Sequence, residues 1–211
     1  ISMSFEDEKM FQAEKTIKYV FKKSETSPFL FIVFSGFSPE GSPPAYNYIR
    51  TLQPFDINKL FILDDYGERG CYYLGKNRHF DVEASVAKLI EWICETNSIS
   101  KDNIIACGSS KGGFAALYYG IKYSYGKVIV GAPQTYLGTY LKNAKAYSTL
   151  EYIAGDTSDE SVKYLDSLLY NIATQAKKIP EILIHVGAGD HHYKGHVIPF
   201  KYHLIQLGFD C

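Results

Sequence analysis

Short apolar runs recur along the chain and are mostly uninterrupted by polar residues. They read TIKYVF, FLFIVF, KLFIL, NIIAC, KVIVG and EILIHV, at residues 16–21, 29–34, 59–63, 103–107, 127–131 and 181–186. Near-continuous apolar strands are typical of a sheet that is covered on both faces, as parallel sheets are in α/β proteins. Each run therefore predicts a strand, and most of the strands should be parallel.

The segments between these runs carry a helical period. The apolar positions of residues 82–93 follow i, i+4, i+7, i+8, i+11 spacing, and they are Val82, Val86, Leu89, Ile90 and Ile93. Asp81 precedes them, where it can cap the start of a helix. Alternating strands and helices predict right-handed crossovers, and hence an α/β fold with a doubly wound, mostly parallel sheet and helices on both faces.

Two segments depart from this rhythm. Residues 35–48, SGFSPEGSPPAYNY, form a loop rich in glycine, proline and serine after the second predicted strand. Residues 134–180 hold helical patterns too long for a single crossover, and we expect a small helical cap there. The whole chain, 1–211, is expected to be one domain with this cap-like insertion.

Composition excludes several classes of function. The chain has 211 residues, 46% hydrophobic and 21% charged, which is enough for one substantial core. A net charge of −1 with scattered lysines does not favour a nucleic-acid partner. No signal-like or membrane-spanning run is present in the sequence, and the four cysteines show no metal-binding spacing. We expect a soluble, cytoplasmic protein with reduced cysteines.

The segment NIIACGSSKGGFAALYYG, residues 103–120, combines a predicted strand, a glycine-serine cluster and a helix. A P-loop requires lysine after its second glycine, and a dinucleotide fingerprint requires GxGxxG, so neither matches. The pattern GxSxG does match, from Gly108 to Gly112. Its serine occupies a sharp strand-to-helix turn that needs small neighbours, which makes Ser110 the candidate nucleophile. The alternative is an ordinary glycine-rich turn with an idle serine.

A nucleophilic serine needs an acid and a base, which follow it in that order in this fold. Asp190 comes directly after the strand predicted at 181–186 and is the candidate acid; the alternative is an aspartate that caps a helix near 195–207. The base is expected after one more strand, so we expect the C-terminal strand and the histidine loop to lie beyond Cys211. Within this chain His196 is the fallback.

The other histidines fit the role of base less well. His191 and His192 adjoin the acid too closely in sequence to be oriented by it easily, and His203 is expected on a helix surface. For each histidine the alternative is a structural or substrate-contacting role. The HHYKGH segment lacks a clear carboxylate or cysteine partner at ligand spacing, so no metal site is expected.

The remaining site candidates concern the oxyanion and the substrate. The backbone N–H groups of Lys111 and Phe37 are the expected oxyanion donors, the latter in the Ser-Gly-Phe turn after residues 29–34. Gly36, Tyr72 and Tyr73 are candidate substrate-binding residues, because a tyrosine face suits a sugar ring. A plain turn and ordinary core packing are the alternatives.

Three stretches resemble a known family: GSSKGGFAALYYG, VGAPQTYLGTYL (130–141), and FSGFSP with AYNYIR. They are similar to the bacterial capsular polysaccharide O-acetyltransferases of α/β-hydrolase fold, to which an acetyltransferase of the accessory secretion system is related. The resemblance runs from about residue 16 to the end. It implies transfer of acetyl from acetyl-CoA, as co-substrate, to a glycan hydroxyl through acetyl-Ser110, with Asp190 as acid and the histidine beyond Cys211.

Three interpretations stay open on the sequence. The favoured one is an acyltransferase acting on a bacterial surface polysaccharide; a carboxylesterase or deacetylase would use the same nucleophile with water as acceptor. The third is a hydrolase-fold scaffold without catalysis in a glycan-assembly or secretion complex. No bound cofactor is expected, and exposed apolar residues in 134–180 would allow a homodimer.

Overall fold

The computed structural model describes residues 6–211 as a seven-stranded mixed sheet. The strands are β1 (Lys9–Gln12), β2 (Thr16–Lys22), β3 (Leu30–Phe34), β4 (Asn58–Ile62), β5 (Ile104–Ser109), β6 (Lys127–Gly131) and β7 (Glu181–His185). Their spatial order is β1-β2-β4-β3-β5-β6-β7. From β4 to β7 all neighbours pair in parallel, whereas β1 and β2 pair antiparallel at one edge. The chain therefore has the α/β fold that its apolar pattern predicts.

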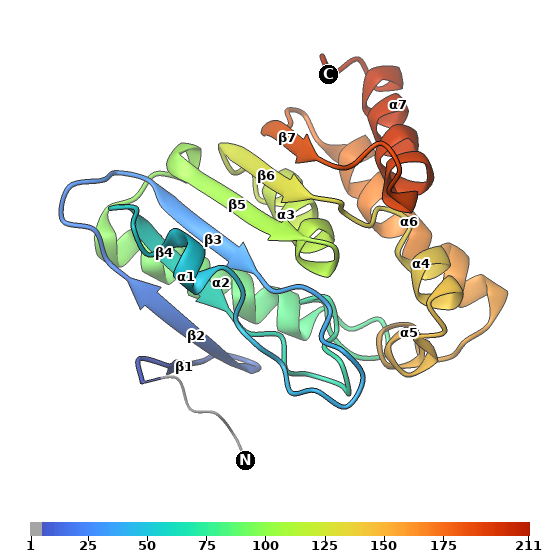
Figure 1. Ribbon diagram of the computed structural model, residues 1–211, viewed down its shortest axis with the longest axis horizontal. Coiled ribbons are helices and arrows are strands. Elements are labelled where there is room, and N and C mark those ends of the chain that lie inside the picture. Colours follow the sequence, from blue (N-terminus) through green and yellow to red (C-terminus); the bar gives the residue numbers. More distant parts are fainter. Residues whose placement is uncertain (1–5) are drawn as a thin grey trace.

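Helices cover both faces of this sheet (Figure 1). They are α1 (Ile49–Leu52), α2 (Asp81–Asn97), α3 (Lys111–Lys122), α4 (Leu137–Asn143), α5 (Tyr147–Ala154), α6 (Asp159–Gln175) and α7 (Ile198–Gln206), with short helical turns at Lys101–Asn103 and Tyr193–Val197. The short helix α1 lies on one face, and α2, α3 and α6 lie on the other. The predicted apolar stripe of 82–93 is buried in α2, which confirms that helix.

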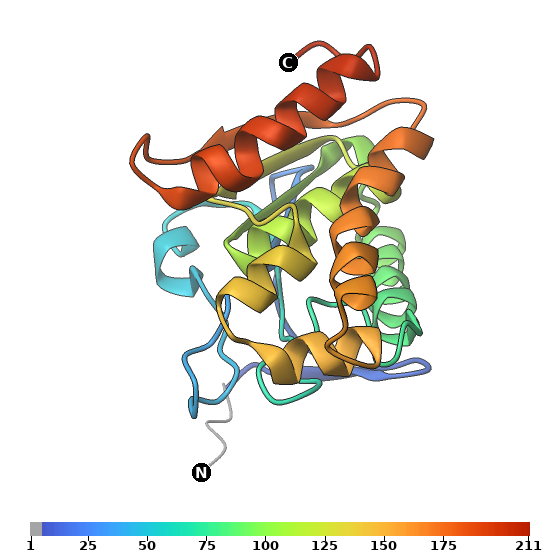
Figure 2. The ribbon, with the colours of Figure 1, turned by 90° about the vertical axis from the view of Figure 1, so that its right-hand side faces the viewer.

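The segment 134–180 forms α4, α5 and α6 between β6 and β7. Helix α6 packs against α3 behind the sheet, while α4 and α5 lie past the carboxyl ends of the central strands. Figure 2 views the molecule from this end, with α4 and α5 in front. These helices therefore stand near the edge at which hydrolase-like sheets carry their chemistry; that they act as a cap stays a prediction.

All six predicted strands are confirmed, but two features of the sheet differ from the expectation. Strand β1 was not predicted, because its four residues KMFQ are largely exposed and form no apolar run. Strand β7, at the end of the sheet, is covered on only one face. That face lies toward α7, and on the opposite face Leu183 is 59% exposed.

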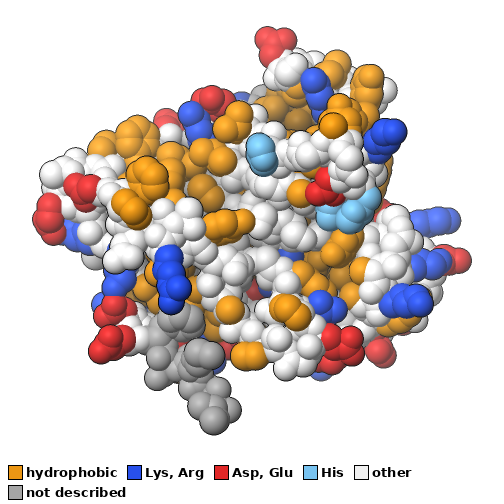
Figure 3. All heavy atoms as spheres, in the orientation of Figure 1, with side chains coloured by type: hydrophobic (Ala, Val, Ile, Leu, Met, Phe, Trp, Pro, Cys, Tyr) orange, Lys and Arg blue, Asp and Glu red, His pale blue; other side chains and the backbone are white. Residues whose placement is uncertain are grey.

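The face that carries α1 is covered only in part. Val20, Val33, Phe61 and Tyr46 form a small cluster under α1, separate from the main core. Beside it lies a shallow groove of about 270 Å³ whose lining includes Phe31, Cys107 and Ile129. Figure 3 shows apolar side chains gathered over this side of the sheet. None of the helices in the described residues is long and apolar enough to span a membrane.

Candidate active site

Ser110 stands at the turn between β5 and α3, in an unusual backbone conformation. Its φ is 53° and its ψ is −115°, a region that side-chain-bearing residues rarely adopt. Its backbone N–H donates to the carbonyl of Gly131 on β6 (3.0 Å), and its carbonyl accepts from Phe114 in the first turn of α3 (3.1 Å). The strained turn is thus held from both sides, and it leaves the Ser110 side chain partly exposed at the carboxyl edge of the sheet.

The glycines around this serine permit a very close approach of backbones. A Cβ at Gly108 would lie 2.4 Å from the carbonyl carbon of Gly112, and a Cβ at Gly112 would lie 2.3 Å from the carbonyl oxygen of Phe34. A Cβ at Gly113 would lie 2.9 Å from the Cβ of Pro133, so this glycine also permits close packing. The GxSxG spacing is therefore a steric requirement of this turn, as the sequence predicts.

The Ser110 hydroxyl has a buried partner, Gln134, on the loop after β6. The Gln134 Nε2 donates to Ser110 Oγ at 2.6 Å, and the Gln134 Oε1 accepts from the hydroxyl of Tyr72 at 2.8 Å. The side chain of Gln134 is fully buried. In the sequence this glutamine appears only within the stretch VGAPQTYLGTYL of the family resemblance, and its contact with Ser110 was not predicted.

Asp190 lies on the loop after β7, where the sequence places the candidate acid. Its Oδ1 accepts from both the backbone N–H and the ring Nδ1 of His192, each at 2.8 Å. These hydrogen bonds lower the pKa of the Asp190 carboxyl. The carboxylate thus holds the backbone and the ring of His192 with one oxygen, at the start of the helical residues that follow it. Its role as the catalytic acid stays a prediction.

His192, not His196, is the histidine that the structure brings to the site. The His192 Nε2 lies 3.4 Å from Nε2 of Gln134, one side chain away from Ser110, and the residue is 8% exposed. The expectation that a histidine two residues from the acid is hard to orient is therefore wrong, because a tight turn folds the ring back onto Asp190. The exposed His191 ring is 3.6 Å from the same carboxylate oxygen.

His196 is occupied elsewhere. Its Nδ1 accepts from the backbone N–H groups of Thr135 (3.0 Å) and Tyr136 (3.2 Å), and its carbonyl accepts from the Thr135 hydroxyl (2.9 Å). Burial lowers the pKa of its imidazole to about 4. Among the described residues its ring makes no hydrogen bond to Asp190 or Ser110. This geometry favours a structural role that ties the 191–197 turn to the loop after β6, and it argues against His196 as the base.

A cleft of about 550 Å³ opens beside Ser110 and is walled by the glycine- and proline-rich loop after β3. Gly36, Phe37 and Ser110 all line it, together with Asn47 and Tyr48. The Gly36 N–H donates to Asn47 Oδ1 (2.6 Å), and the Tyr48 hydroxyl donates to the neighbouring Ser109 (2.8 Å). Asn47 thus closes the loop on itself and Tyr48 joins it to the elbow, and neither contact was predicted from the sequence.

Of the two candidate oxyanion donors, Phe37 lines this cleft, and Lys111 follows Ser110 at the start of α3. Lys111 opens α3, so its N–H has no acceptor within the helix. No hydrogen bond from the Phe37 N–H is recorded among the described residues, and the Phe37 ring lies under the Arg69 guanidinium, 3.9 Å from its carbon. Arg69 also donates twice to the carbonyl of Ser38, which steadies this turn. The arrangement is consistent with donation by both groups, whose role stays a prediction.

Tyr72 and Tyr73 do not line the cleft. Both are fully buried, and the hydroxyl of Tyr73 donates to the carbonyl of Ile62 (2.7 Å) and pairs with Ser35. Burial raises the pKa of both phenols, so they remain hydrogen-bond donors. Neither ring is accessible to a sugar, and the expectation of direct substrate contact is replaced by core packing behind the site.

The Lys111 side chain makes a buried ion pair beneath the elbow. Its Nζ lies 2.8 Å from Oδ2 of Asp64, and both side chains are almost completely buried, at 2% and 0% exposure. Asp64 follows β4 and also accepts from the backbone N–H of Cys71. The pair therefore links α3 to the loop that carries Tyr72.

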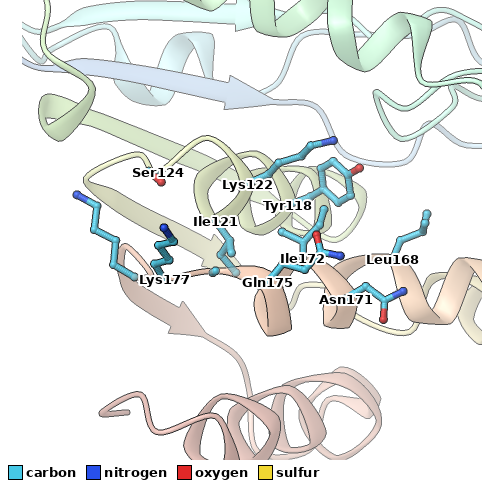
Figure 4. A pocket seen from close by; sticks show the side chains of 11 residues that line it. Tyr118, Ile121, Lys122, Ser124, Leu168, Asn171, Ile172, Gln175 and Lys177 are labelled. Carbon is cyan, nitrogen blue, oxygen red and sulfur yellow. The ribbon is translucent and has the colours of Figure 1, made fainter.

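Two other features of the described residues lie outside this arrangement. The ligand atoms of Asp190, His191 and His192 lie within 4.8 Å of one another, close enough to hold a metal ion, but the same Asp190 oxygen already holds His192. A larger pocket of about 710 Å³ lies between α3 and α6, lined by Tyr118, Lys122 and Gln175 among others (Figure 4). Because Lys122 ends the helix that Ser110 begins, this pocket is remote from the elbow.

Comparison with known proteins places these features in a family. The family model for the accessory Sec system GspB-transporter matches residues 5–174, most of the chain. The chain belongs to this family. A curated accessory Sec system protein of Staphylococcus aureus is 30% identical over 158 residues, which is 70% of this chain and 29% of that protein. Its Streptococcus gordonii counterpart is 27% identical over 161 residues, 72% of this chain and 30% of that protein. The chain thus spans less than a third of these accessory Sec relatives.

Solved structures share the fold. A capsule O-acetyltransferase of Neisseria meningitidis serogroup A superposes with a TM-score of 0.81 at 22% identity, over 95% of this chain and 82% of that one. A mutant of that enzyme in complex with CoA gives a TM-score of 0.80 at 23% identity, over 96% and 84%. A Gap123 glycosylation-associated complex from Streptococcus agalactiae gives 0.73 at 18% identity, over 85% and 36%. At these identities the likeness shows the α/β-hydrolase fold of this accessory Sec family member.

Proposed function

We propose that this chain carries a serine O-acetyltransferase site that moves acetyl from acetyl-CoA to a hydroxyl of a bacterial surface glycan. The observation that carries the proposal is the elbow itself. Ser110 adopts a strained conformation that close backbone packing maintains, and it lines a cleft together with Phe37, one of the two candidate oxyanion donors. Structural likeness to capsule O-acetyltransferases, one bound to CoA, supports the choice of substrates.

In the proposed reaction, Ser110 Oγ attacks the thioester carbonyl carbon while its proton passes to the base. The C–S bond breaks, and the thiolate takes a proton and leaves as the thiol. A glycan hydroxyl then attacks the acetyl-serine, and Oγ recovers its proton as the new ester departs. The N–H groups of Lys111 and Phe37 would stabilise the oxyanion in both steps. Asp190 would orient and stabilise the protonated base.

Two candidates exist for the base. Within the described residues it is His192, which Asp190 already orients. The other is a histidine on a further strand after Cys211, as the sequence resemblance implies. The two are distinguished by comparing the 211-residue chain with a chain extended past Cys211. If His192 is the base, His192→Gln abolishes turnover in both chains. If the base is a histidine after Cys211, only the extended chain is active.

The proposal is tested by incubating wild type, Ser110→Ala and Ser109→Ala with acetyl-CoA and a panel of hexose and N-acetylhexosamine oligosaccharides. Released thiol and glycan masses are recorded. We expect Ser110→Ala to lose a thousandfold or more of the rate, and Ser109→Ala, the matched neighbour, to stay within about threefold. Acetate without acetylated glycan would indicate an esterase. No thiol release from either chain length would indicate a scaffold and overturn the proposal.

A further inference from the structure

The carboxamide of Gln134 is fixed on both of its ends although it belongs to no helix or strand. Its Nε2 lies 2.6 Å from Ser110 Oγ and 3.4 Å from Nε2 of His192. Its Oε1 lies 2.8 Å from the hydroxyl of Tyr72. The Gln134 side chain and Tyr72 are completely shielded from solvent. A buried amide with three polar neighbours can adopt only an orientation that satisfies all of them.

The chemistry of these neighbours selects one orientation. The Asp190 carboxylate accepts from Nδ1 of His192, so the hydrogen of a neutral imidazole is on Nδ1. The Nε2 atom, which faces Gln134, then carries a lone pair. A lone pair must face an N–H donor, which places the NH₂ group of Gln134 toward His192 and Ser110. The Tyr72 hydroxyl, protonated because burial raises the pKa of its phenol, then donates to the Gln134 carbonyl.

We propose that Gln134 is a further catalytic residue that donates a hydrogen bond to Ser110 Oγ, with Tyr72 as the positioning residue that holds the amide in this orientation. The inference rests on the proposed function. One N–H of Gln134 occupies one lone pair of Oγ and does not engage the O–H proton. If His192 is the base, its Nε2 must exchange the long 3.4 Å contact with Gln134 for the Ser110 proton during the reaction. When the acetyl group departs in the second step, the C–O electron pair returns to Oγ, and the same N–H stabilises the negative charge that develops there.

The adjacent Tyr73 provides a matched control for Tyr72. Both tyrosines are fully buried with φ of 56°, and both hydroxyls donate one short hydrogen bond within the protein. The hydroxyl of Tyr73 reaches Ile62 and Ser35, not Gln134. A loss of core hydrogen bonding affects both Tyr→Phe variants, whereas loss of the amide's orientation affects Tyr72→Phe alone.

The first measurement does not require activity. In protein labelled with ¹⁵N at glutamine side chains, the Gln134 NH₂ resonances are assigned with Gln134→Met and followed in the other variants. We expect them to shift in Ser110→Ala, which removes the acceptor, and in Tyr72→Phe, which frees the carbonyl. They should change little in Tyr73→Phe and Ser109→Ala. Unchanged resonances in both Ser110→Ala and Tyr72→Phe would overturn the proposed hydrogen bonds.

The second measurement is the rate at which a fluorophosphonate probe labels Ser110. Loss of one neutral hydrogen bond predicts labelling about tenfold slower in Gln134→Met and about threefold slower in Tyr72→Phe, with Tyr73→Phe near wild type. Gln134→Glu should be slower than Gln134→Met at pH 7, because its carboxylate accepts the Ser110 proton instead of donating one. As pH falls and the carboxyl gains a proton, its labelling rate relative to that of wild type at the same pH should recover, a change that a packing role would not produce.

The two measurements separate the possible failures. If wild type is not labelled while the resonances shift as expected, the proposed function fails and the Gln134 hydrogen bond stands. If wild type is labelled and Gln134→Met is labelled equally fast, Gln134 has no catalytic role and the inference is wrong. Urea unfolding of each variant identifies any that fail to fold. If a Gln134 or Tyr72 variant does not fold, the comparison of Gln134 resonances between wild type and Ser110→Ala tests the hydrogen bond to Ser110.

Discussion

The elbow at residues 108–113 and the histidine-bearing turn at residues 187–196 lie close together but are built in opposite ways. At the elbow, Cβ atoms added to Gly108 and Gly112 would meet backbone atoms within 2.4 Å. In the histidine-bearing turn, Gly189 and Gly195 have no atom within 4 Å of such a Cβ. The nucleophile is thus positioned by backbone packing, whereas the acid and histidine are positioned by side-chain hydrogen bonds on an open turn.

A glycine substitution in each region measures this difference and should give the largest effect. Gly112→Ala places a methyl against the backbone carbonyl of Phe34, and we expect the free energy of unfolding to fall by about 2–3 kcal/mol despite a better helix propensity. Gly189→Ala meets open space and should change it by less than about 0.5 kcal/mol. Urea unfolding of both variants is the measurement, and equal effects would show that the two regions are equally constrained.

Acidification should affect the histidine-bearing turn through His196. Burial lowers its pKa from 6.5 to about 4, so between these values the unfolded chain binds more protons than the folded one. Stability due to the neutral ring is present above about pH 6.5 and is lost as the pH falls toward 4, by roughly 2–3 kcal/mol in all.

The measurement is urea unfolding at pH 7 and pH 4.5. His196→Gln keeps an acceptor for the Thr135 N–H and removes the titration, so its unfolding free energy should change less with pH than that of wild type. His79→Gln removes an exposed ring on another loop and is the control. A pH dependence identical in wild type and His196→Gln would contradict a neutral, structural His196.

The same contrast explains what could be predicted from the sequence. The strands and the elbow depend on local patterns, namely apolar runs and glycine spacing, and these were found with nearly correct limits. Ser110 was identified because steric demands of the turn appear in five consecutive residues. Asp190 was located because an acid after a late strand has one place in the topology.

Contacts between distant segments were not predictable in this way. Gln134 reaches Ser110 across 24 positions and Tyr72 reaches Gln134 across 62, and no spacing rule links them. His196 was preferred to His192 because sequence proximity to Asp190 was taken as an obstacle, although a tight turn brings the His192 ring onto Asp190. Tyr72 and Tyr73 were predicted to contact substrate because an aromatic pair in a sequence does not reveal whether its side chains are buried.

The most direct test of the central claim, that Ser110 is a nucleophile activated at this elbow, is the intact mass of the protein after treatment with a fluorophosphonate. The 211-residue chain and a chain extended past Cys211 are each compared as wild type, Ser109→Ala and Ser110→Ala. We predict a single adduct on wild type and Ser109→Ala and none on Ser110→Ala. An adduct that persists in Ser110→Ala, or wild type without an adduct at both chain lengths, would contradict the account.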